Sequence, residues 1–218
     1  MTTSCDLVVP CRDEALALPD LLSRVPDRFS VIVVDNGSHD DTAAVATRLG
    51  ATVVVEPNPG YGAAVQAGIN AATAELVAVM DGDGTLDPVD LVPLVDAVAR
   101  GDCTLAVGRR RPISAGLVPL AAALGNAAVT RWLRHKGIDV HDIAPARVCR
   151  RTDLLALGVV DRRFGYPVEL LSKAAAAHWS VREYDVTYGP RAAGTRSKVS
   201  GSLRGSALAA ADFVKVLS

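Results

Sequence analysis

Two aspartates, Asp81 and Asp83, follow an apolar run at 75–80 with a single glycine, Gly82, between them. If the extended backbone continues past the run, side chains two residues apart face the same side, so the two carboxylates can share one divalent cation. Mg²⁺ and Mn²⁺ are typically held by a few carboxylates together with phosphate oxygens. The spacing therefore predicts a site for Mg²⁺ or Mn²⁺ and a diphosphate, with Gly82 allowing close approach of a ligand.

Four more apolar runs also end in polar or glycine-rich sequence, at 10–14, 35–38, 58–62 and 108–111. Asp35 can accept hydrogen bonds from a nucleobase or a ribose, since Ser38 and Asp40 are available to cap the next helix. Gly60 and Gly62 are compatible with either a ligand contact or close packing. The polar side chains thus gather at the ends of successive apolar runs.

Basic residues form two clusters, one at 109–111 and one, with Arg191, Arg196 and Lys198, in a loop expected at 189–202. Arginine and lysine on a loop can bind phosphates and exclude water when the loop closes. We therefore expect both clusters to bind anions. The four histidines share no spacing, and we interpret them as structural or exposed. They are His39, His135, His141 and His178.

The elements that must position these residues alternate between strand-like and helix-like segments. Nearly continuous β-favouring runs at 5–9, 30–34, 51–55, 75–80 and 103–107 are typical of strands covered on both faces. Acidic residues or proline precede the helix-like segments at 43–49 and 89–99. This alternation predicts an α/β fold with a mostly parallel sheet, in which ligands bind beyond the carboxyl ends of the strands.

Beyond residue 108 the sequence predicts a helix at 117–135, a short strand near 146–150, a helix at 167–177, a strand at 180–188 and a last helix at about 203–217. We expect residues 1–218 to form a single domain in which 109–218 supply the acceptor-side half and the C-terminal helix.

Composition excludes several classes of protein. The chain has 218 residues, of which 50% are hydrophobic, and this argues against intrinsic disorder. The net charge of −1 and the aromatic content of 4% give no reason to expect a nucleic-acid partner. Four cysteines without a C-x-x-C pair fit a reducing cytosol.

The N-terminal residues lack the plan of a secretory signal. The uncharged stretch at 112–130 contains two prolines and two glycines, so we interpret it as a helix on the sheet or on a membrane surface. We expect a cytoplasmic protein, either free or peripheral at the inner face of the membrane.

Taken in order, the motifs resemble those of family 2 glycosyltransferases of the GT-A fold, and above all the dolichol- and polyprenyl-phosphate sugar synthases. The likeness spans roughly residues 6–200. It is carried by segments that match the family's P-x-x-N-E, V-D-D-G-S, glycine-rich, D-x-D and G-S-R motifs, and by later segments that include Asp142 with Arg147. These segments are 9–14, 34–38, 58–68, 80–83 with 87–88, 108–110, 164–171, 182–186 and 191–198.

The resemblance implies a nucleotide-sugar donor held by residues after the first four strands, with its diphosphate on a metal bound by Asp81 and Asp83. It implies that Arg109 and either Arg191 or Lys198 face donor or acceptor phosphates. The implied donor-binding residues are Pro10, Arg12, Glu14, Asp35, Gly60, Gly62, Asp81 and Gly82.

The chain departs from the family pattern in three places. Asp13 stands where the family has Asn, Asn36 stands for the second Asp of V-D-D-G-S, and 194–198 is one residue longer than G-x-S-K. The third departure leaves the alignment of Arg191 and Lys198 open. The C-terminal membrane helices of many polyprenyl-acceptor members are absent from the sequence, so a polyprenyl phosphate and another small acceptor both stay open.

Inverting displacement at the anomeric carbon is the expected reaction, with the metal and basic residues stabilising the leaving diphosphate. A hydroxyl acceptor needs a general base, and the candidates are Asp142 first and Glu169 second. A phosphate acceptor is already ionised and needs none, in which case Asp142 is a positioning or metal-shell residue. Glu169 could equally be a buried ion-pair partner of an arginine.

Two alternatives remain from sequence. Residues 80–86 also fit the D-x-D-G-T motif of haloacid dehalogenase-like phosphohydrolases, with Asp81 as nucleophile and Asp83 as acid/base, although that motif normally begins its fold. The departures at Asp13 and Asn36 also suit a sugar-nucleotide binding module without turnover. Transfer of a sugar without release of phosphate from sugar phosphates would favour the glycosyltransferase over the phosphohydrolase. Binding of a sugar nucleotide without transfer would favour the binding module.

Overall fold

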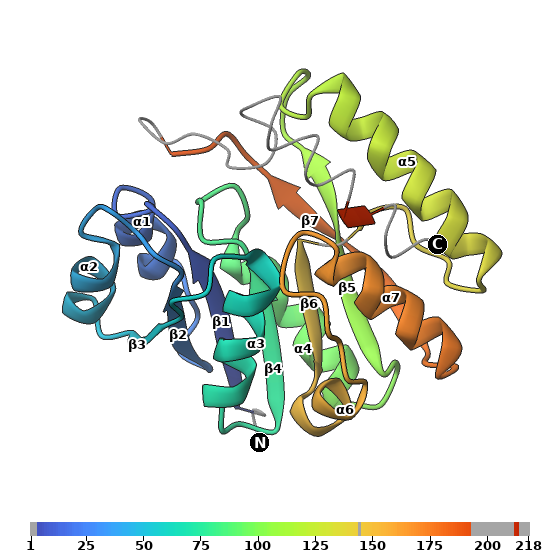
Figure 1. Cartoon of the computed structure of the whole chain (residues 1–218), viewed down its shortest axis with the longest axis horizontal. Helices are drawn as coiled ribbons and strands as arrows, with labels where there is room; N and C mark the ends of the chain where they lie inside the picture. The colour runs from blue at the N-terminus through green and yellow to red at the C-terminus, as the bar shows by residue number, and fades with distance from the viewer. Residues whose placement is uncertain (1–3, 144, 193–211, 214–218) are drawn as a thin grey trace.

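A seven-stranded sheet with helices on both faces organises the part of the chain that the computed structural model describes, residues 4–143, 145–192 and 212–213 (Figure 1). The strands are β1 (Cys5–Cys11), β2 (Phe29–Asp35), β3 (Thr52–Val55), β4 (Leu76–Met80), β5 (Leu105–Pro112), β6 (Ala146–Arg150) and β7 (Val181–Tyr188). The helices are α1 (Leu18–Ser23), α2 (Thr42–Arg48), α3 (Tyr61–Ala71), the 3₁₀ turn η1 (Pro88–Leu91), α4 (Val92–Ala99), α5 (Leu120–His135), α6 (Arg151–Ala156) and α7 (Tyr166–Ala176).

The strand order is β3-β2-β1-β4-β6-β5-β7, and β6 alone among these strands runs antiparallel to its neighbours β4 and β5. The expectation of an α/β fold with a mostly parallel sheet is confirmed. A buried apolar run has the same composition in either direction, so the sequence of β6 did not indicate its orientation.

Two apolar layers flank the sheet. Residues of α3, α6 and α7, such as Val65, Leu154 and Leu170, pack on one face with alternate strand residues such as Val8. Residues of α1, α2 and α4 pack on the other face, again against alternate strand residues. The alternation follows from the two-residue period of a strand, which sends neighbouring side chains to opposite faces.

Two elements begin with the residues expected of them. The Asp87 side chain accepts a hydrogen bond from Val89 N at 3.0 Å and so caps the turn that leads into α4. Asp40 Oδ1 accepts from Thr42 N at 3.0 Å at the start of α2. Helix α5 begins directly after Pro119, three residues later than expected.

The arginines at 109–111 lie within a strand, whereas the sequence suggested that the strand ends at residue 107. β5 continues to Pro112 because β7 pairs with it along its whole length, from Leu105 opposite Val181 to Pro112 opposite Tyr188. The arginine side chains therefore alternate about a strand instead of sharing one flexible loop.

The strand ends converge as expected for a parallel sheet. The last residue of β1, Cys11, pairs with Asp35 at the end of β2. Met80 at the end of β4 pairs with Ala146 at the start of β6, so the segment before β6 reaches the same edge. Among the described residues, no helix is long and apolar enough to span a bilayer. The helix expected at 203–217 lies outside the described residues, apart from Asp212 and Phe213.

Candidate active site

Asp81 lies directly after β4, and one oxygen of its carboxyl group is shielded from solvent. Its Oδ1 is fully buried and has no hydrogen-bond partner among the described residues. Burial, followed by the negative charge of Asp83, raises the pKa of Asp81 to about 6, while Arg147, Arg110 and a hydrogen bond with Tyr61 act in the opposite direction. A buried carboxylate oxygen without a donor is suited to coordinate a cation.

Asp83 is held from two sides. Its Oδ1 accepts hydrogen bonds from Thr85 N at 3.0 Å and Thr85 Oγ1 at 2.6 Å. Its Oδ2 forms an ion pair with Arg191, and the same guanidinium contacts Glu14 Oε1 at 3.2 Å. Arg191, three residues after β7, therefore bridges the loops that follow β1 and β4.

Two carboxylates, those of Asp81 and Asp83, are available here to bind a cation. Within 4–143, 145–192 and 212–213, no third Asp, Glu, His or Cys joins this pair to form a larger metal-binding group. Two carboxylates suit a Mg²⁺ or Mn²⁺ that takes its remaining ligands from a diphosphate and water. The unpartnered Oδ1 of Asp81 is consistent with such an ion.

Arg147 places a positive charge beneath Asp81. It stands on β6 opposite Val79, is only 3% exposed, and donates from Nη2 to the Tyr61 hydroxyl at 3.0 Å. Its guanidinium also lies 5.6 Å from the centroid of the Tyr61 ring and 6.0 Å from that of Tyr166. The aromatic rings and the hydroxyl thus fix a buried cation that offsets part of the charge of Asp81.

The loops after β1 and β2 are joined by side-chain hydrogen bonds. Ser38 Oγ accepts from Asp13 N at 2.9 Å, and Asp13 Oδ1 accepts from His39 N at 2.7 Å. Asp13 has a positive φ of 54°, a conformation that Asn and Asp adopt more readily than most residues. The departure from Asn at this position is therefore compatible with the backbone.

The other predicted donor-binding residues of these loops differ in exposure. Arg12 is exposed, Pro10 and Asp35 are half-buried, and Glu14 is buried. Asp35 Oδ1 accepts from Ser38 N at 3.0 Å, so one of its oxygens closes the turn after β2. The ligand contacts of all four residues stay predictions.

Asn36 is a structural residue of the site. Its Nδ2 donates to Glu56 O at 2.9 Å and Asn58 O at 2.7 Å, and its Oδ1 accepts from Gly60 N at 2.8 Å. A carboxylate could not supply the two donated hydrogen bonds. This arrangement explains why Asn stands here in place of the second Asp of V-D-D-G-S.

The glycine-rich turn at the start of α3 is packed against the 161–163 backbone. A Cβ on Gly60 would lie 2.1 Å from Arg162 O, and one on Gly62 would lie 2.3 Å from Asp161 O. Gly62 N also donates to Arg163 O, at 3.1 Å. The geometry supports a packing role for these glycines, and their contact with a ligand stays a prediction.

Gly82 is required for a similar reason. A Cβ on Gly82 would lie 2.4 Å from Cys11 Sγ and 2.9 Å from Val9 Cγ1. The missing side chain allows the loop with Asp81 and Asp83 to lie against β1.

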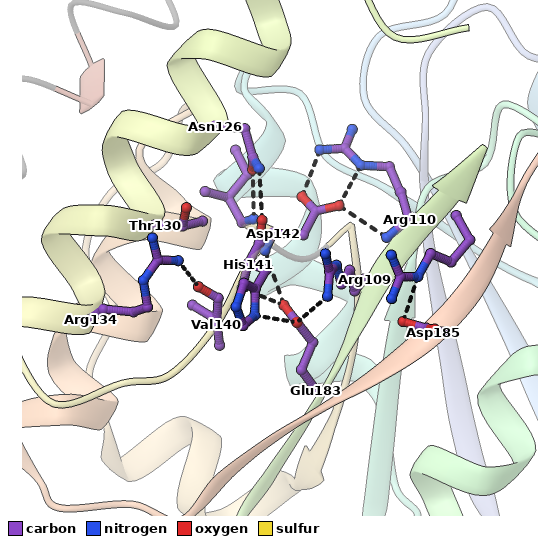
Figure 2. Close-up of polar contacts among 12 residues, drawn as sticks. Arg109, Arg110, Asn126, Thr130, Arg134, Val140, His141, Asp142, Glu183 and Asp185 are labelled. Atoms are coloured by element: carbon purple, nitrogen blue, oxygen red, sulfur yellow. Dashed lines mark hydrogen bonds and ion pairs between the residues drawn. The ribbon is translucent and has the colours of Figure 1, made fainter. Parts of the chain in front are cut away.

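In the C-terminal half of β5, each arginine of 109–111 pairs with an acid (Figure 2). Asp142 accepts from Arg110 N at 3.0 Å, Arg110 Nε at 2.8 Å and Arg110 Nη2 at 2.7 Å. Arg111 contacts Asp185 at 2.8 Å, whereas Arg109 is 3.9 Å from Glu183. Arg109 is therefore the arginine of this cluster least tightly bound by an acid.

His141 is exposed, in line with its interpretation from sequence, but it also meets Glu183, a contact that the sequence did not indicate. Its Nδ1 lies 3.0 Å from Glu183 Oε2, and its backbone N donates to Glu183 Oε1 at 2.6 Å. The two residues are 42 positions apart, so no spacing could have indicated their contact.

Glu169, the second candidate base, binds a loop. Its carboxylate accepts from Val160 N at 3.1 Å and Asp161 N at 2.6 Å and pairs with Lys173 at 3.2 Å. The partner of this buried acid is thus a lysine where the sequence suggested an arginine. Arg196 and Lys198 lie outside the described residues.

Comparison with known proteins identifies the family. The model of "Glycosyl transferase family 2" matches residues 6–154, which include both aspartates after β4. The chain belongs to glycosyltransferase family 2. This membership confirms the predicted enzyme class, a glycosyltransferase, and disfavours the phosphohydrolase interpretation of residues 80–86.

Relatives and solved structures agree with this assignment. An uncharacterized glycosyltransferase of Mycobacterium tuberculosis is 54% identical over 213 residues, 97% of both chains. A dolichyl-phosphate hexose transferase of Haloferax volcanii is 28% identical over 176 residues, covering 80% of this chain and 77% of that protein. The glucosyl-3-phosphoglycerate synthase of M. tuberculosis, solved with Mg²⁺ and UDP, has a TM-score of 0.76 at 22% identity, covering 99% of this chain and 78% of that one. The last likeness confirms the GT-A fold.

Proposed function

We propose that this family 2 glycosyltransferase moves a sugar from a nucleotide diphosphate donor to a small acceptor with inversion, and that it requires Mg²⁺ or Mn²⁺. The observation that carries the proposal is the buried, unpartnered Oδ1 of Asp81 beside Asp83 at the end of β4. When bound, the metal would neutralise charge on the leaving diphosphate. Structures of a relative in fold with Mn²⁺ and UDP support this choice.

The donor would lie over the loops after β1, β2 and β4. In this proposal Asp81 and Asp83 hold the metal, Asp35 binds the base or ribose, and Arg12 and Glu14 line the donor site. Gly60, Gly62 and Gly82 would let the backbone approach the donor closely, and Pro10 would line the donor site. Arg191 already contacts Asp83 and Glu14, so it is near enough to reach a diphosphate bound there. Lys198, which lies outside the described residues, would assist in this proposal.

The acceptor would enter from the side built by residues 109–218. Of the three arginines at 109–111, Arg109 is the most available to bind an anionic group of the acceptor. Its own acidic partner, Glu183, lies 3.9 Å away. Both oxygens of Asp142 bind Arg110, which supports a positioning role for Asp142 over a role as general base. Polyprenyl phosphates are the first acceptor class to test, since a dolichyl-phosphate transferase is among the relatives.

A peripheral location on a membrane would suit such an acceptor, and α5 supports it. Leu120 and Leu124 in its first half are 76% and 63% exposed, as is Ile113 at 63% just before it. Exposed Arg131 and Arg134 follow on the same helix. Apolar residues near basic ones are typical of helices that lie in the interface of anionic membranes.

A transfer assay tests the proposed function. UDP-, GDP- and dTDP-sugars would be incubated with and without Mn²⁺, and nucleoside diphosphate release would be measured with undecaprenyl phosphate and with soluble alcohols. We expect metal-dependent release with at least one donor and acceptor, lost in Asp83→Asn. Donor binding without release with any acceptor would instead indicate a sugar-nucleotide binding module.

A further inference from the structure

The turn at 141–143 is held by three separate elements (Figure 2). Asn126 on α5 donates from Nδ2 to His141 O at 2.9 Å and accepts from Ile143 N at 2.9 Å. Glu183 on β7 accepts from the backbone N of His141 and of Asp142, at 2.6 and 3.0 Å. Arg110 on β5 binds the Asp142 side chain. The turn is thus fixed more firmly than an ordinary surface connection.

The His141 ring is oriented by a carboxylate. Glu183 Oε2 lies 3.0 Å from Nδ1, and because an ionised carboxylate can only accept, Nδ1 carries the hydrogen. In the neutral ring Nε2 is then the nitrogen with a free lone pair, and it has no hydrogen-bond partner among the described residues. The Glu183 side chain is 11% exposed, whereas that of His141 is 46% exposed. A half-buried acid therefore presents an accessible proton acceptor, the arrangement by which enzymes orient a histidine base.

The acids around His141 are already occupied. Asp142 accepts three hydrogen bonds from Arg110, and Glu183 accepts three from the 141–143 turn while facing Arg109 at 3.9 Å. Arg134 of α5 donates to Val140 O at 2.9 Å, next to the turn. Nε2 of His141 is consequently the basic atom of this cluster that is best placed to take a proton.

His141, Asp142 and Glu183 lie at the sheet edge where we propose that the donor binds. The 141–143 turn leads into β6, whose first residue, Ala146, pairs with Met80, the residue before Asp81. Arg110, which holds Asp142, lies close enough to Asp81 to lower its pKa. One electrostatic network therefore joins the turn to the proposed metal site.

We propose that His141, oriented by Glu183, is the general base of this enzyme, and that the acceptor is an alcohol that carries an anionic group for Arg109. This inference rests on the proposed function and names its acceptor class. The acceptor oxygen forms a bond to the anomeric carbon as its proton passes to Nε2. The bond from that carbon to the diphosphate oxygen breaks, and its electron pair leaves with the nucleoside diphosphate. The proton then passes from His141 to solvent.

The test compares two acceptor classes in one enzyme. Initial rates of His141→Gln and wild type would be measured with 3-phosphoglycerate and glycerate as anionic alcohols and with undecaprenyl phosphate, which needs no base. General bases typically contribute about 10²–10⁴ in rate, so we expect kcat with the alcohol to fall at least 100-fold. The loss with the alcohol should exceed the loss with undecaprenyl phosphate at least tenfold. Glu183→Gln should show the same bias, more weakly.

Two controls separate catalysis from folding. His135→Gln changes an exposed histidine of α5 and should keep wild-type rates with both acceptors. Added imidazole should restore part of kcat in His141→Ala with the alcohol acceptor. Equal losses with both acceptor classes, no loss at all, no rescue, or a wild-type enzyme that uses undecaprenyl phosphate and no alcohol would each overturn the inference. Wild-type enzyme inert with every donor and acceptor would overturn the proposed function itself.

Discussion

Arg191 forms an ion pair with Asp83, one of the two aspartates after β4, and its guanidinium reaches Glu14 Oε1 as well. A positive side chain thus occupies the space beside a carboxylate that we propose binds a divalent cation. Both cations would compete for the negative charge of Asp83. We expect the bound metal to weaken this ion pair and to leave Arg191 available to the donor diphosphate.

Removing Arg191 should tighten the binding of the metal alone and weaken donor turnover. We expect Arg191→Ala to bind Mn²⁺ about threefold to tenfold more tightly without nucleotide, the range for loss of one partly exposed competing charge. Titration of Mn²⁺ followed by electron paramagnetic resonance measures the effect. Arg48→Ala, at an exposed position on α2, serves as the control. Weaker Mn²⁺ binding in Arg191→Ala would contradict the competition.

The raised pKa of Asp81 predicts a stability change with pH. Burial and Asp83 raise this pKa from 3.8 to about 6. An acid with a higher pKa in the folded chain holds its proton more tightly there, so stability falls as the pH rises from about 4 to 6 and stays lower above. Asp81→Asn has no charge to bury, so it should not lose stability in this way. Without metal, its free energy of unfolding in urea should exceed that of wild type by about 1–3 kcal/mol at pH 8, with a much smaller difference at pH 4.5.

The same variant should lose all stabilisation by Mn²⁺ with UDP. A metal-free Asp81→Asn protein that is less stable than wild type at pH 8 would indicate that the charged carboxylate stabilises the fold, contrary to the buried position of Oδ1.

Asn36 should be essential for the geometry of the nucleotide side. Asn36→Asp leaves the carbonyls of Glu56 and Asn58 without their donor and should lower the free energy of unfolding by about 1–3 kcal/mol. Chemical denaturation measures this loss. Asn70→Asp, at an exposed position of α3, should change it by less than about 0.5 kcal/mol. Equal effects of the two substitutions would rule out the bridging role of the Asn36 amide.

The exposed leucines of α5 should govern membrane binding. We expect the double variant Leu120→Ser, Leu124→Ser to sediment several-fold less with vesicles that contain an anionic lipid, because buried apolar area drives interfacial binding. Val160→Ser removes a side chain that is 70% exposed outside α5 and should sediment as wild type does. Wild-type protein that stays in solution with such vesicles would refute peripheral binding through α5.

Local sequence patterns predicted most of the fold because the largely buried strands β1, β2 and β4 are nearly continuous apolar runs. The strand near 146–150 has the expected bounds, and the helix expected at 167–177 is shifted by one residue. The length of β5 was not predictable, since its charged half is a strand only through pairing with β7. The prediction that residues at the ends of β1, β2 and β4 bind a ligand followed from their position in a parallel sheet, and it stays a prediction.

Contacts between distant residues could not be predicted in this way. The amide of Asn36 binds residues 20 and 22 positions away, and His141 meets Glu183 across 42 positions. Both depend on how loops from different strands meet, which no single segment specifies. Asp142 was identified from the family pattern, but its three hydrogen bonds with Arg110 appear only in three dimensions.

The central claim is that Asp81 and Asp83 bind a divalent cation together with the diphosphate of a nucleotide. Titration of Mn²⁺ in the presence of UDP, followed by electron paramagnetic resonance, tests it most directly in wild type, Asp81→Asn and Asp83→Asn. The account predicts one bound Mn²⁺ per wild-type chain and at least a tenfold loss of affinity in each variant. Equal Mn²⁺ binding by all three proteins would contradict it.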